Sequence, residues 1–64
     1  MGQYCRILAN TPPDYVVNRV YLDGTSFAVT RFINYDRSTG LAYFWNGNSV
    51  VSVYCRDITA IDWF

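Results

Sequence analysis

The stretch YVVNRVYLDGTSFAVTRFINY, from Tyr15 to Tyr35, decides the fold class of this chain. It holds two runs rich in Val, Tyr, Phe and Ile, which are residue types enriched in β-strands. An Asp-Gly pair lies between the runs, and such a pair between apolar runs is a strong signal for a β-hairpin. We therefore predict strands at Tyr15–Leu22 and Ser26–Tyr35, joined by a tight turn at Asp23-Gly24.

The two-residue period of a strand predicts which side chains of these runs share a face. The predicted sets are Val16, Val20 and Leu22 in the first strand and Phe27, Val29 and Ile33 in the second. Phe32 falls on the opposite side of the second strand. Because Arg31 interrupts the apolar row, we also expect a bend or bulge partway along this strand.

The rest of the chain repeats the alternation of short apolar runs and turn residues. Further strands are predicted at Leu41–Trp45, Val50–Cys55 and Thr59–Phe64, separated by a loop at Asp36–Gly40, a turn at Asn46-Gly47 and a tight turn at Arg56–Ile58. Asn-Gly is among the strongest short hairpin signals.

The N-terminal segment, residues 1–14, is less clear in its pattern. The run QYCRILA fits either an extended strand or a short helix, because Tyr4, Ile7 and Leu8 share helical spacing. We favour the strand. In both cases Pro12-Pro13 ends the element, since proline lacks a backbone donor and holds the preceding residue extended.

Five or six short antiparallel strands with no long helix have to close on themselves to hide their edges. The expected fold class is therefore all-β: one domain over residues 1–64, with a small barrel at 15–64.

A chain of 64 residues buries only about 60% of the surface of its unfolded form, so it commonly needs a staple or a partner. Its hydrophobic content is 52% and its aromatic content 19%. One small core cannot cover that many rings, and exposed rings form patches that bind something. We expect contacts with protein, first of all with copies of the same chain as a homo-oligomer. The candidate interface residues are Tyr43, Trp45, Tyr54, Trp63 and Phe64.

The charges point away from strong binding to a phosphate backbone. All five cations are Arg, all five anions are Asp, and the net charge is zero. Non-specific nucleic-acid binding needs clustered positive charge. Arg in place of Lys does favour planar, stacking contacts, but the plainer interpretation, which we favour, is biased codon composition together with a few surface Arg–Asp pairs.

The composition gives little support to an enzyme, a metal site or a cofactor. The chain has no His to act as a base near neutral pH and no Lys nucleophile, and two isolated Cys are too few for zinc. No phosphate-binding glycine loop, signal peptide or membrane-spanning run is present. Two Cys without a signal favour a cytoplasmic location with reduced thiols.

Several motifs together resemble the Sm-like family of small SH3-like β-barrels. The first half is carried by Leu22-Asp23-Gly24, a long strand that ends in Asn34-Tyr35-Asp36, and Leu41–Trp45. The run Val51–Ile58, followed by Ile61, is similar to the ending of that family, which consists of an apolar-x-apolar strand, an Arg-Gly pair and an Ile-x-x-Ile pattern. The resemblance covers residues 15–64 and implies a barrel that assembles with neighbouring subunits.

The same resemblance implies RNA as an alternative partner. In the family, an Asn after the aromatic-Asp pair and an Arg near the end of the chain hold a nucleobase. Here the Arg is Arg56, but the Asn is replaced by the loop that contains Arg37, and Asp57 stands where the family has Gly. The implied RNA-binding residues are Arg56, Tyr35 and Arg37.

A remote enzymatic alternative depends on four residues. Val51-Ser52-Val53-Tyr54 resembles the Val-Gln-Ile-Tyr strand of the small plasmid-borne dihydrofolate reductases, which are oligomeric β-barrels. Ser52 replaces the Gln and cannot make the same amide contacts.

The tripeptide Tyr-Cys-Arg occurs twice, at Tyr4-Cys5-Arg6 and Tyr54-Cys55-Arg56. If the first copy is a strand, it can pair with the second, place Cys5 opposite Cys55 and cover the edge that subunits use to assemble. The plainer interpretation is that both thiols are small buried hydrophobes. A disulfide is the third alternative.

Overall fold

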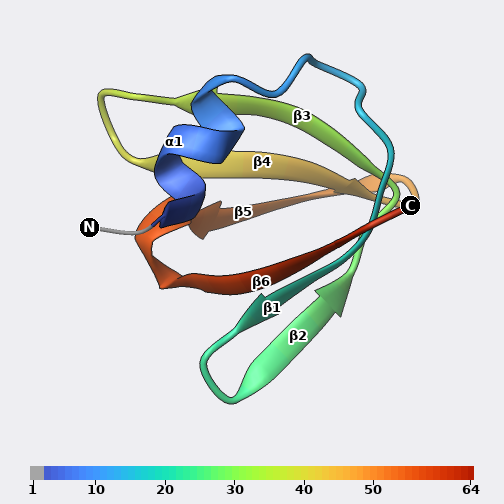
Figure 1. Ribbon diagram of the computed structural model, residues 1–64. Coiled ribbons are helices and arrows are strands. Elements are labelled where there is room, and N and C mark those ends of the chain that lie inside the picture. The colour runs from blue at the N-terminus through green and yellow to red at the C-terminus, as the bar shows by residue number, and fades with distance from the viewer. Residues whose placement is uncertain (1–2) are drawn as a thin grey trace.

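The computed structural model describes residues 3–64, which form one short helix followed by six strands and a single 3-10 turn (Figure 1). The elements are α1 (Gln3–Ala9), β1 (Val17–Leu22), β2 (Thr25–Ala28), β3 (Arg31–Asp36), β4 (Leu41–Asn46), β5 (Ser49–Tyr54), η1 (Cys55–Asp57) and β6 (Ile58–Trp63). The first two residues of the N-terminal segment lie outside the described residues.

The strands form two three-stranded antiparallel sheets, in the orders β2-β1-β6 and β3-β4-β5. The prediction of short antiparallel strands as the main structure is therefore confirmed. In this pairing β2 and β6 are the edge strands of one sheet and β3 and β5 those of the other, and the six strands do not close into a ring. Figure 1 shows α1 beside the end of the sheets where β3 turns into β4.

The preference for an N-terminal strand was wrong, because residues 3–9 form α1. The segment is helical because a helix with this spacing of apolar residues directs Leu8 into the core, where 1% of its surface is exposed. The carbonyl groups at the end of the helix are capped: Thr11 Oγ1 donates to the carbonyl of Ile7 at 2.8 Å, and Asn10 Nδ2 donates to that of Arg6 at 3.0 Å. Pro12-Pro13 follows directly, as expected.

The two predicted hairpins are present, with one difference in position. Asp23-Gly24 joins β1 to β2, and Gly24 takes the positive φ of 78° that the turn requires. In the second hairpin Asn46 pairs with Ser49, so the central residues are Gly47 and Asn48. Gly47 takes a φ of 60°, which agrees with a type II′ turn, in which glycine occupies the first of the two central positions.

The predicted strand at 26–35 is divided into β2 and β3 at Val29-Thr30, which confirms the expected bend. Its consequence for the faces was not foreseen. Val29 and Phe32 both lie in the core, with 6% and 1% of their surfaces exposed, although the regular period placed them on opposite sides. The break at Val29-Thr30 interrupts the regular alternation between these two residues.

A second irregularity changes the face of Val16. Strand β1 has a register shift against β6 between Val17 and Arg19. As a result Val17 and Val20 are each 1% exposed, whereas Val16 is 42% exposed. The prediction of Val16 as a partner of Val20 on one face was therefore wrong, because one irregular residue reverses the side-chain alternation.

The core lies between the two sheets and is closed by α1. Phe32 and Phe44 are its largest side chains, with ring centroids 5.5 Å apart and planes at 58°. Five of the other rings are exposed: Tyr15, Tyr21, Trp45, Tyr54 and Phe64. The expectation that the core cannot cover all the aromatic side chains is confirmed.

Candidate functional site

The first candidate site is the solvent-facing side of β4 and β5, here called the outer aromatic face. Ala42 and Phe44 of β4 have no exposed surface, so the alternate residues of that strand point outward. In the register of β4 and β5, each outward residue of β4 lies opposite an outward residue of β5. The face consists of Leu41, Tyr43 and Trp45, paired with Tyr54, Ser52 and Val50 respectively.

Three of the five predicted interface residues meet on this face: Tyr43, Trp45 and Tyr54. Trp45 and Val50 lie directly opposite each other and are 37% and 53% exposed, while Tyr54 is 45% exposed. The sequence interpretation did not include Leu41 and Val50. Their alternation with buried residues on the same strands is the signal that identifies them.

The outer aromatic face continues into an unpaired strand edge. The amide of Cys55 donates to the carbonyl of Gly40 at 2.9 Å. Backbone groups alternate between the two sides of an antiparallel strand, so those of Tyr54, Ser52 and Val50 point to the free edge of β5. This edge therefore presents backbone donors and acceptors beside apolar side chains.

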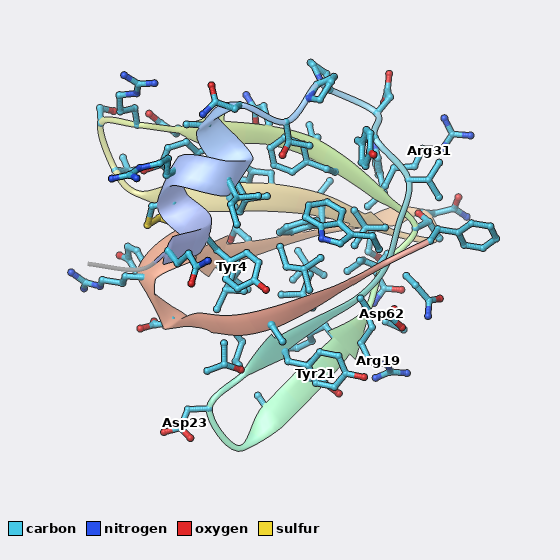
Figure 2. All side chains as sticks on the ribbon, in the orientation of Figure 1. Tyr4, Arg19, Tyr21, Asp23, Arg31 and Asp62 are labelled. Carbon is cyan, nitrogen blue, oxygen red and sulfur yellow. A yellow bond between two sulfur atoms is a disulfide. The ribbon has the colours of Figure 1, made fainter. Side chains whose placement is uncertain are left out.

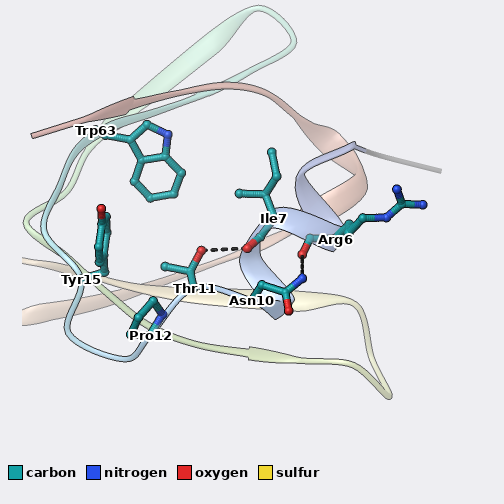
Figure 3. Close-up of a pocket in the computed structure, with 7 residues that line it drawn as sticks. All are labelled: Arg6, Ile7, Asn10, Thr11, Pro12, Tyr15 and Trp63. Carbon is teal, nitrogen blue, oxygen red and sulfur yellow. Dashed lines mark hydrogen bonds between the residues drawn. The ribbon is translucent and has the colours of Figure 1, made fainter.

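The other two predicted interface residues, Trp63 and Phe64, lie elsewhere, at the end of β6. Trp63 packs edge to face on Tyr15, with ring centroids 5.6 Å apart and planes at 82°. Both rings line a groove of about 580 Å³ between the segment after α1 and β6 (Figure 3). The remaining lining residues are Arg6, Ile7, Asn10, Thr11 and Pro12. Phe64 is 91% exposed.

The two Tyr-Cys-Arg copies are joined by a disulfide between Cys5 and Cys55, with their Cα atoms 5.0 Å apart. The expectation of reduced thiols is therefore wrong, and it no longer supports a cytoplasmic location. The proposed cover of an assembly edge is also wrong, because the first copy belongs to α1 and pairs with no strand. Instead, the bond ties α1 to η1.

The disulfide lies beside a second candidate site, here called the disulfide pocket. Its volume is about 350 Å³, and its lining residues are Cys5, Tyr35, Thr39, Gly40, Tyr54, Cys55 and Arg56. The guanidinium of Arg56 lies over the ring of Tyr54, 5.1 Å from its centroid. Tyr35 and Arg56, two of the three residues implied for RNA, are thus brought together, whereas Arg37 lines a neighbouring pocket with Tyr35 and Leu8.

The turn next to the disulfide pocket contains a carboxylate with a shifted pKa. Oδ1 of Asp36 accepts hydrogen bonds from the Ser38 hydroxyl at 2.7 Å and the Ser38 amide at 3.0 Å. These bonds favour the ionised form and hold the pKa of Asp36 below its ordinary value. The carboxylate is therefore unsuited to act as a base near neutral pH.

Other kinds of site have less support in the described part of the chain. Residues 3–64 contain no group of three or more His, Cys, Asp or Glu side chains placed to hold a metal ion. Within the same range, no helix has the length and apolar character needed to span a membrane. Ser52 and Tyr54, the residues of the reductase resemblance, lie exposed on the outer aromatic face.

Comparison of the chain with family models, with curated proteins and with solved structures found no match.

Proposed function

We propose that this protein is a non-catalytic assembly module that binds copies of itself through the outer aromatic face and the free edge of β5. The observation that carries the proposal is the combination at one place of exposed apolar side chains and unpaired backbone groups. Natural proteins usually protect such an edge with charges, proline or a covering element. Residues 49–54 of β5 include neither a charged residue nor proline.

The need for a stabilising partner is a weaker argument than the surface itself. The disulfide already supplies the staple that so short a chain commonly requires. Self-association is therefore proposed because apolar surface and hydrogen-bonding edges remain available, and not because the chain lacks stability alone.

The proposed architecture is a curled SH3-like or Sm-like barrel with an opening between β5 and β6. Backbone bonds continue past the break between β2 and β3: the amide of Val17 donates to the carbonyl of Thr30 at 3.1 Å, and the amide of Phe32 donates to the carbonyl of Tyr15 at 2.8 Å. These bonds support an interpretation of β2 and β3 as one bent strand beside β1 and the residues before it, which is the connection that a barrel of this kind requires.

The proposed contact pairs β5 of one copy with β6 of the next. A pairing of this kind satisfies both of these edge strands in every copy, whereas a β5–β5 contact leaves β6 unpaired. Because the two surfaces differ, such a contact closes into a ring or extends into a filament. The resemblance to Sm-like barrels favours the ring.

Native mass spectrometry and sedimentation velocity test this proposal. We expect a mass that is a multiple of the single chain. Val50→Lys places a charge on the outer aromatic face, and Ser52→Pro removes an outward amide while leaving the bonds to β4 intact. Both should lower the assembled mass, whereas Thr25→Lys, an exposed change on β2, should not. A single-chain mass for the unmodified protein at high concentration contradicts the proposal.

Single-stranded RNA is the second candidate partner, since Tyr35, Tyr54 and Arg56 line one pocket. Tyrosine and guanidinium planes are surfaces on which unpaired bases stack. Fluorescence anisotropy with a short labelled RNA at two salt concentrations tests it. Binding that weakens with salt and is lost in Arg56→Gln supports RNA recognition, and absence of binding at low salt eliminates it.

A further inference from the structure

The two cysteines that line the disulfide pocket differ in exposure. Cys55 is 2% exposed and belongs to the core. Cys5 is only partly buried, because it lies on the short helix α1, and both residues line the pocket. We therefore expect a molecule that enters the pocket to reach Cys5 more readily than Cys55.

The pocket also favours one charge. Among the residues of 3–64 that line it, Arg56 has the only ionisable side chain apart from the tyrosines, and its guanidinium lies over Tyr54. The volume of about 350 Å³ falls at the lower end of the range of small-molecule sites. A small ligand with a carboxylate group matches both features.

We propose that the Cys5–Cys55 disulfide is an exchange site for a small anionic thiol, which reacts at Cys5. The thiolate of the incoming molecule attacks Cys5 Sγ, a new bond forms between these two sulfurs, and the Cys5–Cys55 bond breaks. Cys55 leaves with the electron pair as a thiolate. A second thiol molecule then attacks the mixed disulfide, which releases the oxidised small disulfide and leaves Cys5 reduced.

The surroundings of Cys55 suit it to be the leaving group. The Tyr35 hydroxyl lies 3.6 Å from Cys55 Sγ and is the donor in this contact, since a disulfide sulfur carries no hydrogen. Burial disfavours a thiolate at this position, while the hydrogen bond from the Tyr35 hydroxyl offsets part of that cost. The greater exposure of Cys5 selects it as the residue that is attacked, and the Tyr35 hydroxyl stabilises the thiolate of Cys55 that leaves.

The test uses the oxidised, unmodified protein and reduced glutathione as the probe. Samples are quenched with acid, their free thiols are alkylated, and peptides are mapped by mass spectrometry. We expect glutathione on Cys5 and the alkyl group on Cys55. Glutathione on Cys55, an equal distribution, or no mixed disulfide under conditions where dithiothreitol opens the bond overturns the proposal.

The charge preference is tested with Arg56→Gln. The rate at which glutathione opens the bond should fall by about threefold, which is the usual effect of losing one exposed charge pair. The rate with 2-mercaptoethanol, which carries no carboxylate, should fall less. Arg31→Gln is the matched control, because Arg31 lies at the opposite end of the molecule from the disulfide (Figure 2). Equal losses with both thiols mean that Arg56 acts only structurally, which contradicts an anion preference.

Discussion

Asp36 shows how one turn sets a measurable property of a single side chain. Its carboxylate is bonded to the hydroxyl and amide of Ser38 in the folded protein, and its pKa lies below the ordinary value. A carboxyl group with a lowered pKa in the folded state stabilises the fold above the pKa of the unfolded chain. That contribution is lost as the pH falls through the lower, folded pKa.

Ser38→Ala should raise the pKa of Asp36 toward its ordinary value, because the variant removes the hydroxyl bond. The measurement is an NMR titration of the Asp36 carboxyl group. The variant should lose stability at neutral pH and match the unmodified protein in strong acid, where Asp36 is protonated in both. Ser52→Ala, which changes an exposed serine on β5, serves as the control. An unchanged pKa in Ser38→Ala contradicts this account.

Gly47 is the residue that the second hairpin requires for backbone reasons. Its φ is 60°, and no heavy atom lies within 4 Å of the place where a Cβ would be. Gly47→Ala should therefore cost only the strain of a left-handed alanine, about 1 kcal/mol in the free energy of unfolding. Urea denaturation measures it. Asn48→Ala, next to it but without positive φ, should cost less; equal losses argue against strain as the cause.

At the scale of secondary structure, α1 depends on tertiary contacts. A helix of seven residues is too short to be stable in isolation. It is held by the buried Leu8, by the partly buried Tyr4, which lies between α1 and β6 in Figure 2, and by the disulfide. Its local sequence is therefore a poor guide to its structure.

Leu8→Ala should lower the free energy of unfolding by about 2–5 kcal/mol, which is the usual cost of emptying a buried leucine site. Gln3→Ala, an exposed change on the same helix, should stay within about 0.5 kcal/mol of the unmodified protein. Urea denaturation followed by circular dichroism compares the two. Similar costs for both variants mean that α1 does not close the core.

At the scale of the complete chain, the disulfide is the largest single constraint. It joins residues separated by 50 positions, and a loop of this length predicts a stabilisation of about 4 kcal/mol from the reduced entropy of the unfolded chain. That is a large share of the stability of so small a protein.

Reduction should therefore shift the urea midpoint strongly downward. The measurement compares oxidised and reduced protein by circular dichroism. The double variant Cys5→Ala/Cys55→Ala provides the control, because its midpoint should not respond to reductant. A midpoint that is the same in oxidised and reduced protein shows that the bond does not stabilise the fold.

Local patterns in the amino-acid sequence predicted the strands, the hairpin turn at Asp23-Gly24, the bend before Arg31 and the excess of aromatic side chains. They also predicted the second hairpin, one residue before its observed central residues, Gly47 and Asn48. These features depend on residues within a few positions of each other, so a short window contains the information. The gathering of Tyr43, Trp45 and Tyr54 on one face also follows from alternation, once the strands are known.

Three features depended on contacts between distant segments. Val17 lies in the core in place of Val16 because β1 meets β6 in a shifted register. Residues 3–9 are helical because Leu8 finds a site between the sheets. Cys5 bonds to Cys55, and Tyr35 and Arg56 line one pocket, because the helix closes the end of the fold where β5 leaves its sheet. The preference of a residue for a strand or a turn depends on its near neighbours in the sequence, whereas these contacts form only once the chain has packed.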